Sequence, residues 1–306
     1  MKNKKITVNV SIPAYNSEKT IEKLIRSILI QKRINYKLES VVVHSDSSSD
    51  NTVKTVRNFK NNLVSVIAAK KRSGYSSSLI KLIKRNKADL LLQLNDDVII
   101  NDSHFIEKLI KPFFANKNLG LVCGNIQPLK PTSYVGKAAQ SGYIAFKNLG
   151  EKINHGSNAF TCDGKSLCFS NTFASSIKFP INHKDMGNSD GFIYLTCIKN
   201  GFDYAYAKYA ILYFKLPTTL KDFTKWQVRS YKSNKYVLKN YFGDLAEKEF
   251  KIPKLLFNYY KAIEFIKHPI SSILIQFIGF YCTYKAAKEK NEFNLKWDLV
   301  QSTRDL

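Results

Sequence analysis

The chain has 306 residues, of which 44% are hydrophobic, so it is long enough to bury a substantial core in one large domain or two smaller ones. Charged residues make up 24%, an ordinary share that argues against wholesale disorder. Lysine and arginine outnumber aspartate and glutamate by 48 to 24, which gives a formal net charge of +24. That surplus would attract nucleic acid, an anionic membrane face or a phosphorylated small molecule. Because Lys, Asn and Ile are abundant together along the whole chain, a compositional bias explains a large share of it.

The cysteines and the first residues indicate the cellular compartment. The cysteines are odd in number and form no C-x-x-C pair, so we expect buried, reduced thiols in a cytosolic protein. They are Cys123, Cys162, Cys168, Cys197 and Cys282. The basic start, 1–5, is followed by an alternating segment that meets Pro13 too soon for a signal peptide. The sequence therefore predicts a cytoplasmic protein.

Strand and helix patterns alternate over the first 125 residues. Strands are predicted at 6–12, 40–43, 63–68, 90–94 and 119–123, and helices at 18–28, from Asp50, at 77–85 and up to Phe114. Ser17 and Ser103 are expected to cap the first and last of these helices. Short apolar strands between amphipathic helices indicate βαβ units and a parallel sheet covered on both faces. Ligands of such sheets bind beyond the carboxyl ends of the strands.

The pattern is weaker in the second half of the chain. Between Gln127 and Asn158, prolines and glycines obscure the periodicity, and no element is predicted there. Order returns at 160–170, with a helix predicted from Asp190 to Asn200, a strand at 204–214, and helices after Pro217. The apolar segment 269–284 is shorter than the roughly 20 residues that a membrane-spanning helix needs, so we expect an interfacial or packed helix.

Polar side chains gather in three loops that follow predicted strands. These loops are 13–17, 44–52 and 95–97. In the third loop, Asp96 and Asp97 are adjacent carboxylates that repel each other, and a divalent cation such as Mg²⁺ or Mn²⁺ offsets that cost most easily. Such a cation would bridge phosphates and stabilise a departing diphosphate. The alternative is a solvated turn with helix caps, since Asp and Asn are common in turns.

Taken in chain order, these loops resemble the inverting glycosyltransferases of family 2. The resemblance is carried by the runs VSIPAYNS at 10–17, VVVHSDSSSDNT at 41–52 and LQLNDD at 92–97. Downstream, CDGKSLCFS at 162–170 resembles the family's acceptor-side strand, and Ser189-Asp190 its Glu-Asp catalytic-base helix. Residues 217–232, with QVRSY at 227–231, resemble a degraded Gln-x-x-Arg-Trp element. Together these motifs cover about the first three quarters of the chain.

The resemblance implies an α/β fold with a Rossmann-like nucleotide-sugar-binding domain. We expect a mostly parallel mixed sheet flanked by helices, followed by a helical C-terminal region. The catalytic domain would span 1–216, with a nucleotide-binding half at 1–125 and an acceptor half at 126–216. The helical region would span 217–306 and could associate with a membrane.

The resemblance also implies roles for individual residues. Metal binding falls to Asp97 and catalytic-base function to Asp190, and the cofactor would be Mg²⁺ or Mn²⁺. The residues expected to bind the donor nucleotide are Pro13, Ala14, Tyr15, Asp46, Arg72 and Asp96, with Arg72 placed to reach a phosphate. Gly164 and Gln227 would lie on the acceptor side. If Asp190 is not the base, Asp185 and His183 are the next candidates.

The implied activity is inverting transfer of a sugar from a nucleotide-sugar, most often a UDP-sugar, to a lipid-linked or cell-surface glycan acceptor. The inner membrane face, rather than nucleic acid, is the expected larger partner, because no nucleic-acid-binding module is recognisable. Three departures from the family pattern, Ser45, Asn95 and Ser189, each replace an acidic residue. They keep open a catalytically inactive relative that only binds nucleotide-sugar. Ser230 and Tyr231 replace the Arg and Trp of the last motif, which argues against a processive polymer synthase.

Overall fold

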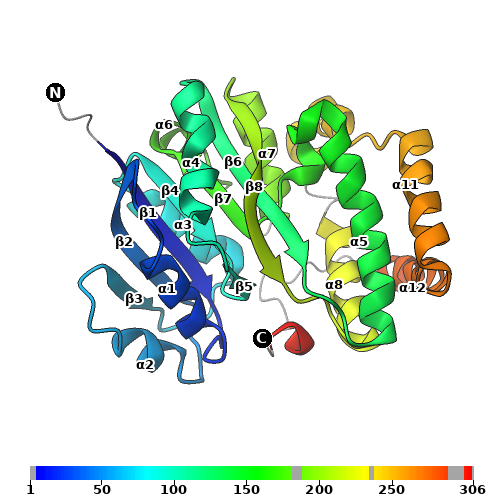
Figure 1. The fold of residues 1–306 in the computed structure, drawn as a ribbon, viewed down its shortest axis with the longest axis horizontal. Coiled ribbons are helices and arrows are strands. Elements are labelled where there is room, and N and C mark those ends of the chain that lie inside the picture. Colours follow the sequence, from blue (N-terminus) through cyan, green and yellow to red (C-terminus); the bar gives the residue numbers. More distant parts are fainter. Residues whose placement is uncertain (1–4, 181–187, 234–237, 289–299, 305–306) are drawn as a thin grey trace.

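The computed structural model describes residues 5–180, 188–233, 238–288 and 300–304, and its centre is one mixed sheet of eight strands (Figure 1). The strand order is β3-β2-β1-β4-β7-β6-β8-β5. The strands are β1 (Ile6–Ala14), β2 (Tyr36–Ser45), β3 (Val64–Ala68), β4 (Leu90–Leu94), β5 (Val98–Ile99), β6 (Leu119–Pro128), β7 (Ser166–Ser170) and β8 (Asp203–Phe214). The predicted α/β class with a mostly parallel mixed sheet is therefore confirmed.

Helices cover both faces of this sheet. They are α1 (Ile21–Leu29), α2 (Thr52–Arg57), α3 (Tyr75–Arg85), α4 (Phe105–Ala115), α5 (Tyr134–Lys152), α6 (Asn171–Ser176), α7 (Ser189–Lys199), α8 (Leu220–Ser233), α9 (Lys239–Phe242), α10 (Asp244–Glu249), α11 (Lys254–Lys267) and α12 (Pro269–Lys288). Two apolar clusters form the core, one with α1 and α4 and the other with α3, α6 and α7. Alternate side chains of β4 enter opposite clusters: Leu92 belongs to the first and Leu91 to the second.

The sheet changes direction at β7. The strands β1 to β4 pair in parallel, whereas β7 runs antiparallel to both β4 and β6. In the β4–β7 pair, Leu94 lies opposite Ser166. Consequently the loop that leaves β4 and the loop that enters β7 lie at the same edge of the sheet.

A long helix occupies the region where the sequence predicted no element. The helix α5 runs through 134–152 and packs against α8, α11 and α12, which lie together on one side of the sheet (Figure 1). Its glycines serve this packing, since a Cβ at Gly142 would lie 3.0 Å from the Ile275 side chain of α12. Within the described part of the chain, no helix is both long enough and apolar enough to cross a membrane.

Two predicted helix caps are wrong. The first helix begins at Ile21 after Thr20, and the hydroxyl of Ser17 donates instead to the carboxylate of Asp96. The fourth begins at Phe105 after His104, and the Gln31 side chain, rather than Ser103, accepts a bond from the Ile106 N–H in its first turn, at 3.1 Å. The other predicted elements agree with the structure within a few residues, and all five cysteines are buried free thiols.

Candidate active site

A cavity of about 1060 Å³ opens at the carboxyl ends of the parallel strands and extends to α5, α8 and α11. Every residue that the resemblance singled out for a role lines it. They are Pro13, Ala14, Tyr15, Asp46, Arg72, Asp96, Asp97, Gly164, Asp190 and Gln227. Residues separated by more than 200 positions in the sequence therefore share one space.

The end of the cavity expected to hold the nucleotide is formed by the loops after β1, β2 and β3. The guanidinium of Arg72 lies over the Tyr15 ring, with its carbon 3.8 Å from the ring centroid, which gives a flat cationic surface at this end of the cavity. The Asp46 carboxylate accepts bonds from the backbone N–H groups of Ser73 (2.8 Å) and Gly74 (2.7 Å). Gly74 has a φ of +91°, a conformation that favours glycine. Asp46 thus fixes the loop that presents Arg72.

The two adjacent carboxylates after β4 have different surroundings. Asp96 accepts bonds from the Tyr15 backbone N–H (3.2 Å), the Ser17 hydroxyl and the Arg304 guanidinium. Asp97 Oδ1 is buried and has no hydrogen-bond partner among the described residues. Burial, and then the charge of Asp96, raises the pKa of Asp97, although Arg304 and Lys165 oppose the shift.

This acidic pair fits a cation that brings its own ligands. Among the described residues, no cluster of three or more His, Cys, Asp or Glu side chains could hold a metal. Mg²⁺ typically takes one or two protein carboxylates, keeps several waters and completes its shell with substrate phosphates, and the unpartnered oxygen of Asp97 suits that arrangement. If the protein binds such an ion, the free oxygen of Asp97 is placed to be one of its ligands.

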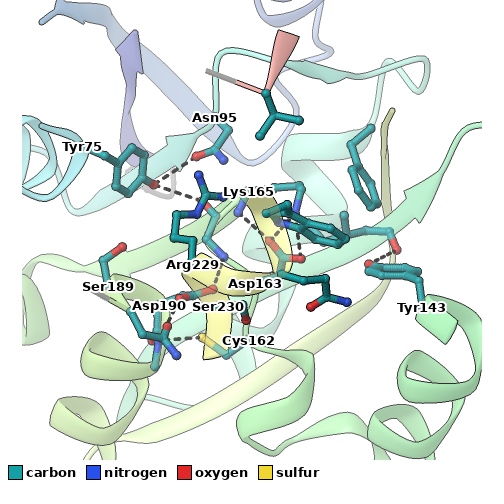
Figure 2. Close-up of a pocket in the computed structure, with 18 of the residues that line it drawn as sticks. Tyr75, Asn95, Tyr143, Cys162, Asp163, Lys165, Ser189, Asp190, Arg229 and Ser230 are labelled. Carbon is teal, nitrogen blue, oxygen red and sulfur yellow. Dashed lines mark hydrogen bonds and ion pairs between the residues drawn. The ribbon is translucent and has the colours of Figure 1, made fainter. Parts of the chain in front are cut away.

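Asp190 lies at the start of α7 and points toward the glycine loop that precedes β7 (Figure 2). Its Oδ2 accepts a bond from the Gly164 N–H at 3.1 Å. The cap of α7 is Asn188, whose side chain accepts from the Gly191 N–H at 3.0 Å. Burial, and then the charge of Asp163, raises the pKa of Asp190, while the Gly164 bond and Lys165 lower it. Asp190 is therefore not needed as the helix cap.

Tyr75 connects the acidic loop to the Asp190 region. Its hydroxyl lies 3.0 Å from Asn95 Oδ1 and 3.3 Å from the Gly164 carbonyl oxygen. Figure 2 shows Tyr75 facing Asn95. The Asn95 N–H also donates to the Lys165 carbonyl at 3.2 Å. Asn95, which replaces an acidic residue of the family motif, thus has a structural role between the two loops.

Two positively charged side chains that the sequence analysis missed lie between the carboxylates. Lys165 Nζ is 3.1 Å from Asp163 Oδ1 and 4.4 Å from the centroid of the Phe214 ring. Burial lowers the pKa of Arg229, and the charges of Asp97 and Asp190 oppose that shift. Arg229 lies within the predicted 227–231 motif, one position before the expected arginine, and that motif was the only signal for it. Lys165 had none beyond its place beside Gly164.

Asp185 and His183, the alternative bases, lie outside the described residues. Of the motif departures, Ser45 donates its hydroxyl to Ser48 Oγ at 2.8 Å, and Ser189 is buried at the first position of α7.

Two solved structures with the same fold are of sugar-transferring enzymes in complex with a nucleotide or nucleotide-sugar and Mn²⁺. A mannosyltransferase from Pyrobaculum calidifontis, in complex with GDP-Man and Mn²⁺, matches 94% of this chain and 89% of its own with a TM-score of 0.63 at 15% identity. Glucosyl-3-phosphoglycerate synthase from Mycobacterium tuberculosis, in complex with Mn²⁺, UDP and phosphoglyceric acid, matches 78% of this chain and 79% of its own with a TM-score of 0.55 at 15% identity. The fold is therefore the GT-A type of glycosyltransferases.

The sequence comparison defines the family. Residues 9–178 match the model of glycosyl transferase family 2, and the chain belongs to that family. It is 25% identical over 272 residues to poly-beta-1,6-N-acetyl-D-glucosamine synthase of Staphylococcus aureus, and 22% identical over 270 residues to that of Staphylococcus epidermidis. The first match covers 83% of this chain and the second 85%. The chain spans 63% and 62% of the length of these relatives. The chain thus carries a glycosyltransferase domain of family 2.

Proposed function

We propose that this enzyme transfers a sugar, with inversion, from a UDP-sugar to a lipid-linked or cell-surface glycan acceptor. A divalent cation at Asp97 would hold the donor diphosphate, and Asp190 would be the general base. The observation that carries the proposal is the hydrogen-bonded connection through Tyr75, from Asn95 to Gly164 and on to Asp190. This connection fixes the position of the loop after β4 relative to Asp190. A single displacement requires such fixed positions, because the donor and the acceptor must be held in the right geometry at the same time.

The electrostatics of Asp190 suit the removal of a proton from an acceptor hydroxyl. Because burial and Asp163 raise its pKa, Asp190 is a stronger base than an ordinary aspartate, and general-base catalysis improves as the pKa approaches the working pH. When bound, Mg²⁺ or Mn²⁺ would neutralise charge on the leaving diphosphate. The side chain of Arg229, under the influence of both Asp97 and Asp190, adds positive charge at the centre of the cavity.

The inactive alternative remains testable because three family carboxylates are replaced. Two features support activity: both carboxylates with assigned chemical roles are present, and Asn95 takes part in the connection between the loops. Release of UDP or GDP from their sugars, with Mn²⁺ and water as acceptor, decides between the alternatives without knowledge of the natural acceptor. Binding of the donor without any release, by a purified and folded protein, would favour the inactive relative. Salt-sensitive binding of polynucleotide without a nucleotide-sugar response would favour a nucleic-acid role.

The acceptor side of the cavity is apolar, which supports a lipid-linked acceptor. Beyond Gln227, the cavity is lined by Phe146 of α5, Phe257 of α11 and Ile275 of α12. The outer faces of α11 and α12 also expose large apolar side chains. Those more than two-thirds exposed are Leu255, Ile266, Ile270, Phe277 and Phe280. A lipid carrier in the membrane would reach the cavity alongside α11 and α12, whose residues Phe257 and Ile275 line it.

The charges on α11 and α12 favour an anionic lipid surface. Both helices are described in full; their basic residues are Lys254, Lys261, Lys267, Lys285 and Lys288, and their single acidic residue, Glu264, is buried. A lysine near an anionic membrane contributes about 1 kcal/mol, and apolar insertion adds to this. We therefore propose that the enzyme binds the inner membrane face through this surface while the opposite faces of the helices pack on α5 and α8.

Flotation with anionic vesicles at low salt tests this attachment. Phe277→Glu should reduce the floated fraction, because it places a negative charge at the apolar face. Ile30→Glu, at an equally exposed apolar residue after α1, should not. Absence of wild-type flotation, or an equal loss in both variants, would contradict membrane attachment and leave the transferase proposal intact.

A further inference from the structure

Arg304 forms a two-point ion pair with Asp96. Its Nη1 lies 2.9 Å from Asp96 Oδ2 and its Nη2 lies 3.1 Å from Asp96 Oδ1. The Arg304 side chain is 13% exposed and that of Asp96 8%. Nη1 also donates to Ser17 Oγ at 2.9 Å. A buried bidentate pair is among the stronger polar contacts in proteins, so this one is a built feature of the cavity wall.

The segment that carries Arg304 is anchored to the start of α8. It forms a short 3-10 turn, Gln301–Thr303, in which the Ser302 N–H donates to Asp222 Oδ2 at 2.9 Å. The Thr218 N–H in turn donates to Ser302 Oγ at 3.2 Å. Val300, Thr303 and Arg304 line the same cavity as Asp97 and Asp190. The contacts with the start of α8 therefore position the Arg304 guanidinium beside Asp96, in the loop after β4.

Arg304 and a divalent cation would both be attracted by the carboxylates of Asp96 and Asp97. The Arg304 guanidinium is bound to Asp96 at two points, and Asp97 is the next residue in the chain. Burial lowers the pKa of Arg304, and the charges of Asp96 and Asp97 raise it. A cation held by Asp97 would lie close to Arg304, and like charges at such distances repel in a poorly solvated site. A diphosphate bound to that cation supplies new negative oxygens, to which a guanidinium binds well.

We propose that Arg304 competes with the divalent cation for the acidic pair and passes from Asp96 to the diphosphate when the donor binds. The inference rests on the proposed function, because it assumes a nucleoside diphosphate and a divalent cation at Asp97. Arg304 thereby favours binding of the cation and the nucleotide together over binding of the cation alone. Its removal has effects of opposite sign on the two ligands.

Calorimetric titration of Arg304→Gln tests this inference with two probes, Mn²⁺ alone and UDP or GDP in saturating Mn²⁺. Loss of one positive charge beside the ion should tighten Mn²⁺ binding about tenfold, since interactions of this size follow from unit charges a few ångströms apart. Loss of a phosphate contact should weaken nucleotide binding about tenfold. Arg304→Lys keeps the positive charge but loses the two-point contact that a guanidinium makes. It should therefore change Mn²⁺ binding little and weaken nucleotide binding. Arg85→Gln, an exposed arginine at the end of α3, is the charge-matched control and should change neither affinity.

The outcomes separate this inference from the proposed function. If Arg304→Gln leaves both affinities unchanged, or weakens both as the melting temperature falls, Arg304 is a structural tie and the inference is wrong, while nucleotide binding by the wild type stands. If the wild type binds neither UDP nor GDP in Mn²⁺, the proposed function and the inference fail together. If Arg304→Gln does not fold, Ser302→Ala replaces it, because it loosens the turn. In Ser302→Ala, Mn²⁺ binding should tighten and nucleotide binding should weaken, each about threefold. If neither affinity changes, the inference is wrong.

Discussion

Replacement of Asp190 by asparagine separates a catalytic role from a structural one. Asparagine keeps an oxygen that can accept the Gly164 N–H and leaves the Asn188 cap untouched, but it cannot take a proton. Loss of a general base typically costs about 10²–10⁴-fold in rate. We therefore expect release of nucleoside diphosphate from the donor to fall by about that factor, while donor affinity in Mn²⁺ stays near that of the wild type.

The raised pKa of Asp190 predicts whether Asp190→Asn stabilises or destabilises the fold. An aspartate whose pKa is higher in the folded chain than in the unfolded chain binds protons more readily when folded. Its stabilising effect is present at low pH and is lost as the pH rises through the folded pKa, so ionised Asp190 costs stability at neutral pH. Against this, both carboxylate oxygens of Asp190 accept a backbone N–H, from Gly164 and from Gly191, and asparagine has an oxygen for only one of them. The lost hydrogen bond and the weaker interaction with the helix dipole each cost about 1 kcal/mol or less. The melting temperature should therefore be unchanged or slightly higher.

The assay compares Asp190→Asn with Asp203→Asn, an exposed aspartate at the start of β8. Donor hydrolysis, calorimetric donor binding and thermal melting are measured for both. Asp203→Asn should match the wild type in all three. An Asp190→Asn variant that keeps more than about a tenth of the hydrolysis rate would refute the assignment of the base, and attention would pass to Asp185 and His183.

Three further expectations follow from contacts in the structure. Asp97→Asn should weaken UDP binding in Mn²⁺ by calorimetry without lowering the melting temperature, because the amide removes the charge that would hold the cation; unchanged affinity would remove Asp97 from the site. Asp163→Asn should move the acid limb of the hydrolysis pH profile to lower pH, since Asp163 raises the pKa of Asp190; a shift upward would contradict this coupling. Gly120→Ala should destabilise the fold by about 1–3 kcal/mol, because its Cβ would lie 2.7 Å from Phe202 Cβ; an unchanged melting temperature would contradict this packing.

The sequence predicted the elements of the first 125 residues better than those that follow. In the first 125 residues, apolar side chains at regular spacing coincide with the buried face of each element. In α1, for example, Ile21, Leu24, Ile25 and Ile28 recur at helical spacing and all are buried. The helix α5 was missed because glycines lower helix propensity and hide the periodicity. In the fold those glycines admit neighbours such as Ile275, so tertiary packing outweighs local preference.

The candidate site divides in the same way. Residues within family motifs, such as Asp97 and Asp190, were found because their order along the chain is informative. Arg304 and Lys165 were missed because a single positive residue in a lysine-rich chain carries no local signal. Their placement depends on the turn anchored at α8 and on the start of β7, which are tertiary features.

The antiparallel pairing of β4 with β7 determines how precisely the two ends of the site can be spaced. Since a strand advances about 3.4 Å per residue, a slip of two residues in this pairing would displace Gly164 by roughly 7 Å from the end of β4. A slip of one would turn every β7 side chain to the other face. The hydrogen-bond ladder between Leu94 and Ser166 therefore sets the spacing in discrete steps. Changes to the lining of the acceptor cavity can accumulate on α5, α8 and α11 without altering it, so acceptor preference can diverge while the reacting geometry is retained.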